Sequence, residues 1–100
     1  MIRATTPRHV FIFPDDIDPS ACTTILITYH QGNKKIFEIT TDQLTIDGQE
    51  VSYHLSQEET KLFGQLAAKV QVRVLLSGEA LASNIISFNV DPVLNDEVLT

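Results

Sequence analysis

Residues 51–90 read VSYHLSQEETKLFGQLAAKVQVRVLLSGEALASNIISFNV, and they predict a strand, a short helix and a hairpin in succession. Val51, Tyr53 and Leu55 alternate with more polar neighbours, which is the period of a strand with one buried face. This order of elements is typical of an antiparallel β domain that carries one helix at a corner. The stretch contains no catalytic motif, so it indicates a fold class and not an activity.

A helix is expected over 57–66, directly after this first strand. Ser56 and Glu59 have the spacing of a capping box, in which a hydroxyl and a carboxylate satisfy free amide groups at the helix start. Gly64 costs up to about 1 kcal/mol relative to alanine, so we expect the helix to be short or frayed. The expected apolar stripe of the helix consists of Leu62, Phe63 and Leu66.

Two strands joined by a tight turn are expected after the helix. Apolar residues alternate with others over 70–76, and Ser77-Gly78-Glu79 supplies the turn. The returning strand is expected over 80–90. Asn84 falls in the apolar phase of that strand, which predicts a bulge or a bend near residues 83–85.

The part of the chain before the helix also has the pattern of short strands separated by turns. Gln31-Gly32-Asn33-Lys34 and Asp47-Gly48 are hairpin signals, and the polar segment 15–20 between two prolines is expected to be a loop. The apolar run over 9–13 predicts a strand with both faces covered. The strands expected in this part are 9–13, 22–29, 35–41, 44–46 and 49–55.

These elements predict an all-β fold, namely an Ig-like antiparallel β-sandwich. It has about seven strands, with one short helix between the fifth and the sixth. One hundred residues make a single domain, 1–100. The chain has no Trp and one Cys, so it lacks the hallmarks of an antibody domain. Segments 1–7 and 91–100 either project as flexible arms that order on assembly or fold back over the sheets.

Charge and composition limit the classes of partner. The net charge of −6 argues against nucleic acid, which requires a basic patch. No apolar run approaches the roughly 18 residues of a membrane span. The first residues lack the apolar core of a signal peptide. We therefore expect synthesis in the cytoplasm, with neither nucleic acid nor a membrane as partner.

The sequence contains no recognisable catalytic, cofactor-binding or metal-binding residues. Cys22 is the only cysteine, and its place at the start of an apolar strand predicts a buried structural thiol. The histidines lack ligand spacing, and the carboxylates of the 15–20 loop lack the spacing of an EF-hand, so a solvated turn is expected there. We expect no enzyme activity and no cofactor. The residues considered for a metal site are His9, His30, His54, Asp15, Asp16 and Asp18.

Several short stretches with a structural role are spread along nearly the whole chain. They are 1–3, 5–7 with His9, 55–60, 71–75, 80–83 and 95–99. In these stretches the chain resembles a family of phage and prophage proteins of Gram-positive bacteria, of similar length and encoded among virion structural genes. The family has no assigned activity, so the resemblance implies no site residues. It implies a structural or accessory protein whose partners are other phage structural proteins and further copies of itself, first in the host cytoplasm and then in the virion.

Three functions remain open. The first is a non-enzymatic virion structural or accessory protein that works through protein–protein contacts. The second is a module that recognises carbohydrate on a host surface, for which only Tyr29 and Tyr53 are available besides phenylalanine. The third is an acidic phage-encoded inhibitor of a host protein. One contiguous acidic face favours the third function, and scattered charge favours the first.

Overall fold

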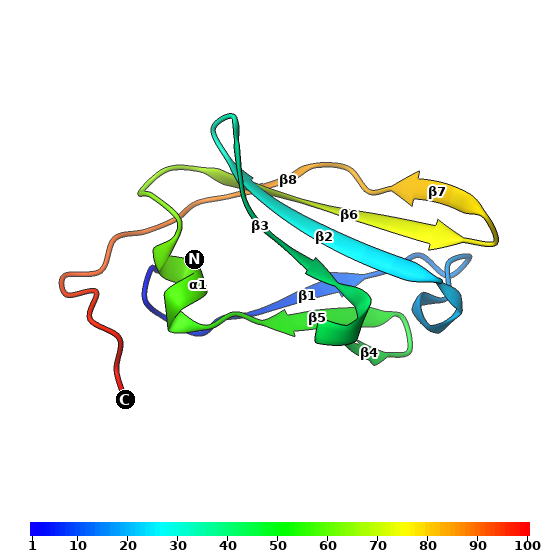
Figure 1. The fold of residues 1–100 in the computed structure, drawn as a ribbon, viewed down its shortest axis with the longest axis horizontal. Coiled ribbons are helices and arrows are strands. Elements are labelled where there is room, and N and C mark those ends of the chain that lie inside the picture. Colours follow the sequence, from blue (N-terminus) through cyan, green and yellow to red (C-terminus); the bar gives the residue numbers. More distant parts are fainter.

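The computed structural model describes all of residues 1–100 and contains two antiparallel β-sheets packed around one core (Figure 1). Its strands are β1 (Arg8–Ile12), β2 (Thr24–Gln31), β3 (Lys34–Thr40), β4 (Thr45–Asp47), β5 (Glu50–His54), β6 (Ala68–Leu76), β7 (Glu79–Ala82) and β8 (Ile86–Phe88). The three-stranded sheet has the order β1-β5-β4, and the five-stranded sheet has the order β3-β2-β6-β7, with β8 also paired to β6. The helices are α1 (Gln57–Lys61) and the 3-10 turns η1 (Pro19–Ala21) and η2 (Thr41–Gln43).

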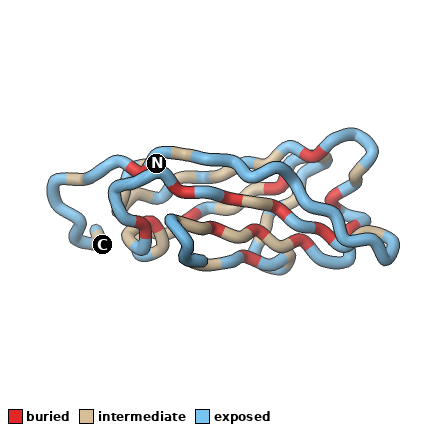
Figure 2. Tube along the Cα trace, turned by 90° about the horizontal axis from the view of Figure 1, so that it is seen from above, coloured by how far each residue is buried: buried red, intermediate tan, exposed pale blue.

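The core lies between the two sheets. Ile25, Ile27 and Tyr29 on β2 are fully buried, and buried valines alternate with more exposed residues along β6. Figure 2 shows this alternation of buried and exposed residues along the strands. The alternation predicted over 70–76 therefore matches the buried face of β6.

The hairpin turns lie where the sequence predicts them. Gly32 and Gly48 have φ angles of +62° and +59°, in the left-handed region that glycine adopts without strain. Ser77 and Gly78 both have positive φ, which gives the two-residue turn between β6 and β7 the twist that suits adjoining strands. The helix lies between the fifth and the sixth strand, as expected.

The prediction that the first strand has both faces covered is wrong. His9, Phe11 and Phe13 face the core side, but Val10 and Ile12 are 48% and 75% exposed on the other side. The physical reason is that no further layer covers the outer face of the three-stranded sheet.

The predicted end of the helix at residue 66 is also wrong, because α1 ends at Lys61, while the expectation of a short helix is confirmed. Gln31 on β2 binds the backbone that would continue the helix: Oε1 accepts from the Gly64 amide (2.6 Å), and Nε2 donates to the carbonyls of Gly64 (2.9 Å) and Leu66 (3.1 Å). Of the expected stripe only Phe63 is buried, at 1% exposed, whereas Leu62 and Leu66 are 57% and 72% exposed.

The predicted last strand is divided into β7 and β8, so the structure has eight strands. Ala82 pairs with Arg73, and Ile86 pairs with Val70. Between these two pairs the chain advances by four residues (82 to 86), whereas β6 advances by three (73 to 70), so the β7–β8 side contains one extra residue. The division confirms the irregularity expected at residues 83–85. Ser83 anchors it, since its amide donates to the Val72 carbonyl (2.8 Å) and its hydroxyl accepts from the Val72 amide (3.0 Å).

The start of the chain folds back on the segment after β8. Ile2 forms a parallel bridge with Asp91, and the Met1 amine donates to the Asn89 carbonyl at 2.8 Å. The Arg3 guanidinium donates to the carbonyl of Lys61 at 3.1 Å, which ties this segment to the end of α1. Leu94, near the other end of the chain, is fully exposed. Flexibility of 91–100 stays a prediction.

Candidate interaction groove

One side of the molecule is open because each sheet ends there in an unpaired strand edge. β1 pairs only with β5, while β7 and β8 pair only with β6. Between these edges lies an apolar groove of about 430 Å³. An unpaired edge presents free amide and carbonyl groups to any strand that can reach it. Free backbone groups and an apolar groove therefore occur together on this side.

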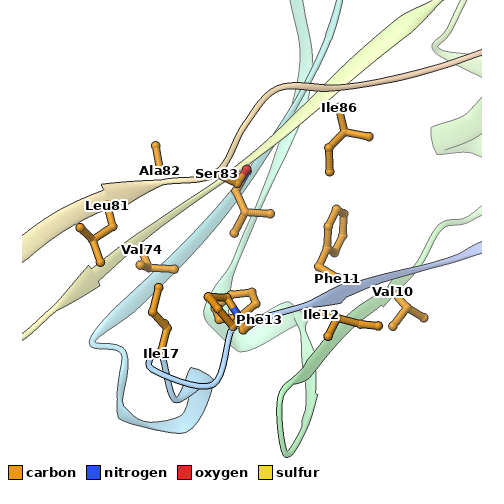
Figure 3. Close-up of a pocket in the computed structure, with 12 residues that line it drawn as sticks. Val10, Phe11, Ile12, Phe13, Ile17, Val74, Leu81, Ala82, Ser83 and Ile86 are labelled. Carbon is orange, nitrogen blue, oxygen red and sulfur yellow. The ribbon is translucent and has the colours of Figure 1, made fainter.

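Both sheets contribute apolar side chains to the groove. Phe11 comes from the inner face of β1, Phe13 directly follows that strand, and Val74, Leu81 and Ile86 come from the opposite sheet. Figure 3 shows Phe11 directed from β1 toward Ile86. The groove therefore continues the core outward, to the open edge.

The pairing of β1 with β5 shows which backbone groups face the open edge. At its two ends, the Leu55 amide donates to the Pro7 carbonyl (2.9 Å) and the Phe13 amide donates to the Gln49 carbonyl (2.8 Å). In an antiparallel pair, alternate residues direct their amide and carbonyl groups to the same neighbour. The odd-numbered residues of β1 therefore bond to β5. Arg8, Val10 and Ile12 direct theirs to the open edge.

Charge is divided between the two ends of this edge. Arg8 is exposed at the start of β1, and Ile12 at its end pairs with Glu50. The loop that follows is held at the same end, because the Gln49 side-chain amide donates to the carbonyls of Phe13 (3.3 Å) and Pro14 (2.7 Å). The acidic side chains at this end are Asp15, Asp16, Asp47 and Glu50. The edge is thus basic where β1 begins and acidic where it ends.

An aromatic cluster fills the core between the sheets, outside the groove. His9 lies against Tyr29 and Phe88, and Tyr29 stacks on Phe37 with ring centroids 4.8 Å apart. Nδ1 of His9 is 2.6 Å from the Tyr29 hydroxyl oxygen. Burial, and then the positive N-terminus, lower the pKa of His9. Burial raises the pKa of Tyr29, and the charge of Glu59 adds to that rise. This cluster holds the two sheets together and lines no part of the groove.

Glu59 is occupied by the helix cap and by a tyrosine. Its Oε1 accepts from the Ser56 amide (2.8 Å), which confirms the predicted capping box, and its Oε2 accepts from the Tyr53 hydroxyl (2.7 Å). Burial, followed by this hydrogen bond, raises the pKa of Tyr53 to about 12. Both oxygens of this carboxylate therefore have structural partners.

The residues considered for a metal site do not converge. No group of three or more His, Cys, Asp and Glu side chains is placed to hold a metal ion. Asp18 accepts from the Ser20 amide (3.0 Å) and hydroxyl (2.7 Å), so it caps η1. Cys22 is buried as predicted, and burial, followed by the charge of Asp18, raises the pKa of its thiol.

Reasoning from the sequence missed the groove. The available signal was the run over 9–13, whose residues are apolar in both phases of the strand. That pattern fits a strand between two layers, and it equally fits an edge strand whose outer face is free.

The chain matches no protein-family model, no curated protein and no solved structure. None of its helices has the length and the apolar character that a membrane span requires.

Proposed function

We propose that the protein is a non-enzymatic structural or accessory protein of a phage or prophage particle, and that it acts through protein–protein contacts. The observation that carries this proposal is the apolar groove between two unpaired strand edges. Such an edge binds a partner through main-chain hydrogen bonds, and an adjoining apolar groove accepts the partner's alternate side chains. The resemblance to virion-region proteins supplies the setting: host cytoplasm during assembly, then the particle, with other phage structural proteins as partners.

The proposal includes an Ig-like sandwich that lacks its first strand. In that fold one sheet has the order A-B-E-D, and the other contains C, F and G with C′ beside C. The order β1-β5-β4 corresponds to B-E-D, and β3-β2-β6-β7 corresponds to C′-C-F-G. Strand A lies beside B, which is the position of the unpaired edge of β1. The strand order supports this assignment, and it explains why the core is open at the groove.

The two alternative functions have less support. Carbohydrate recognition uses exposed aromatic rings, but Tyr29 is fully buried and the Tyr53 hydroxyl is bonded to Glu59. An acidic inhibitor requires one contiguous acidic face. Here Asp15, Asp16, Asp47 and Glu50 lie at one end of the three-stranded sheet, but most of the other carboxylates are spread over β3, η2, α1, β7 and the segment after β8.

Purified particles provide the test. Particles released from the source strain should contain the protein at a constant ratio to the major structural proteins through successive density gradients, as measured by quantitative mass spectrometry. Deletion of the gene should reduce the yield of infectious particles or change their composition. Particles that lack the protein, together with normal assembly in the deletion strain, would contradict the proposal.

A further inference from the structure

We propose that the open edge is completed by a second copy of this chain. Strand β1 of each copy pairs antiparallel with β1 of the other across a two-fold axis, so each copy supplies the strand that the other lacks. This inference rests on the proposed function, because it names the partner of the same groove. A two-fold interface uses the same surface on both copies, and the edge must therefore be complementary to itself.

The charges along the edge satisfy this requirement. Antiparallel pairing places Arg8 of one copy beside the end of β1 in the other copy, which Asp15 and Asp16 follow. The two-fold axis repeats the same contact at the opposite end. Opposite charges across paired strands stabilise the pairing, and like charges destabilise it. A parallel arrangement would bring the like-charged ends together.

The free backbone groups restrict the register. Only residues that direct amide and carbonyl groups to the open edge can bond across it, so Val10 pairs either with Val10 or with Ile12 of the other copy. The charges select the second register, because it places Arg8 opposite Pro14, directly before Asp15 and Asp16, at the cost of the one bond that Pro14 cannot donate. In this register Phe11 lies on the two-fold axis. This register covers the exposed side chains of Val10 and Ile12 with each other. It also places Arg8 next to the acidic loop of the second copy.

The same arrangement closes the groove. Strand β1 of the second copy lies where the first strand of an Ig-like sheet would lie. Its inward residue Phe11, and Phe13 directly after the strand, extend over the opening. A five-residue strand is short. Its edge buries less than the ~800 Å² per partner of a standard interface. We therefore expect a dimer that dissociates on dilution.

Sedimentation equilibrium of the full chain over a concentration series tests the proposal. The mass should rise from 11.1 kDa toward twice that value as the concentration increases. Ile12→Lys places a charge on the edge and should keep the protein monomeric throughout, since lysine on an edge strand blocks pairing. Leu66→Lys is the matched control. Leu66 is 72% exposed, close to the 75% of Ile12, and lies outside the groove, so this variant should dimerise like the wild type.

Disulfide formation tests the register without relying on variants that disrupt the dimer. Paired residues that share hydrogen bonds lie about 5.5 Å apart at Cα, within the range of a disulfide. A mixture of Val10→Cys and Ile12→Cys proteins should form a covalent dimer on oxidation much faster than either protein alone. Circular dichroism melts of every variant verify that the fold is retained.

Two outcomes would overturn the inference. One is a wild-type chain that stays monomeric at all concentrations. The other is a dimer that Ile12→Lys leaves intact. Neither outcome changes whether the protein is detected in particles. Sedimentation therefore tests the dimer, and particle composition tests the proposed function separately.

Discussion

Nδ1 of His9 lies 2.6 Å from the hydroxyl oxygen of Tyr29, and this hydrogen bond joins the two sheets across the core. His9 is on β1 and Tyr29 is on β2, with Phe88 packed against both rings. An aromatic environment solvates charge poorly. The bond therefore favours a neutral imidazole and a neutral phenol, which agrees with the lowered pKa of His9 and the raised pKa of Tyr29.

Stability should decrease in mild acid because of His9. Its pKa is lowered in the folded protein, whereas in the unfolded chain it is near the ordinary 6.5. Below about pH 6.5 the unfolded chain therefore binds the proton more readily, and the free energy of unfolding falls as the pH drops toward the lower folded value. Above about pH 6.5 this contribution is constant. Urea unfolding between about pH 5 and pH 8 measures the slope.

The variant that tests this prediction is His9→Asn. It should flatten the slope below about pH 6.5. Equal slopes for the wild type and His9→Asn would show that His9 is not the responsible group.

Tyr29→Phe should lower the free energy of unfolding by about 1–2 kcal/mol at neutral pH. The ring remains and fills the same space, but Nδ1 of His9 loses its only side-chain partner. A double-mutant cycle with His9→Asn isolates the pairwise contribution, which should be positive. Additive effects of the two substitutions would mean that the hydrogen bond does not couple these residues.

Phe63 and Leu66 should differ strongly in their effect on stability. Phe63→Ala removes a ring buried between the aromatic residues and should cost about 3–5 kcal/mol. Leu66→Ala removes an exposed side chain and should change stability by no more than about 0.5 kcal/mol. Chemical denaturation of both variants measures the difference. Comparable losses of stability in the two variants would contradict the short α1 and favour the longer helix that the sequence predicts.

Amide hydrogen exchange should separate the two ends of the chain. The Arg3 amide donates to the Asp91 carbonyl at 3.1 Å, and the Asp91 amide donates to the Met1 carbonyl at 2.7 Å, so both amides should be protected. The amide of the fully exposed Leu94 should exchange at close to the rate of an unstructured peptide. Rapid exchange at Arg3 would instead indicate that 1–7 is a flexible arm.

Local patterns in the sequence predict most of the strands, turns and the helix cap. The alternation over 70–76, the Ser56–Glu59 spacing and the Asp47-Gly48 turn each depend on residues close together in the chain. The end of α1 could not be predicted in this way. Gln31, more than 30 residues earlier, takes the backbone groups that a longer helix would use.

The groove was beyond prediction for the same physical reason. Phe11 and Ile86 are brought to one opening by the order of strands in two sheets, and no local pattern encodes which strand edges remain unpaired. Apolar residues in both phases of a strand are compatible with burial and with a docking edge alike. Only the three-dimensional pairing distinguishes them.

The bridge between Ile2 and Asp91 gives the chain a nearly closed path. Both termini leave the molecule beside α1, away from the Ser77-Gly78 turn (Figure 1). A short linker between the ends and a new opening at the exposed Gly48 turn would reorder the strands in sequence while keeping their neighbours in space. The protein is therefore suited to circular permutation, and a fluorescent or affinity label at either terminus would leave β1 accessible.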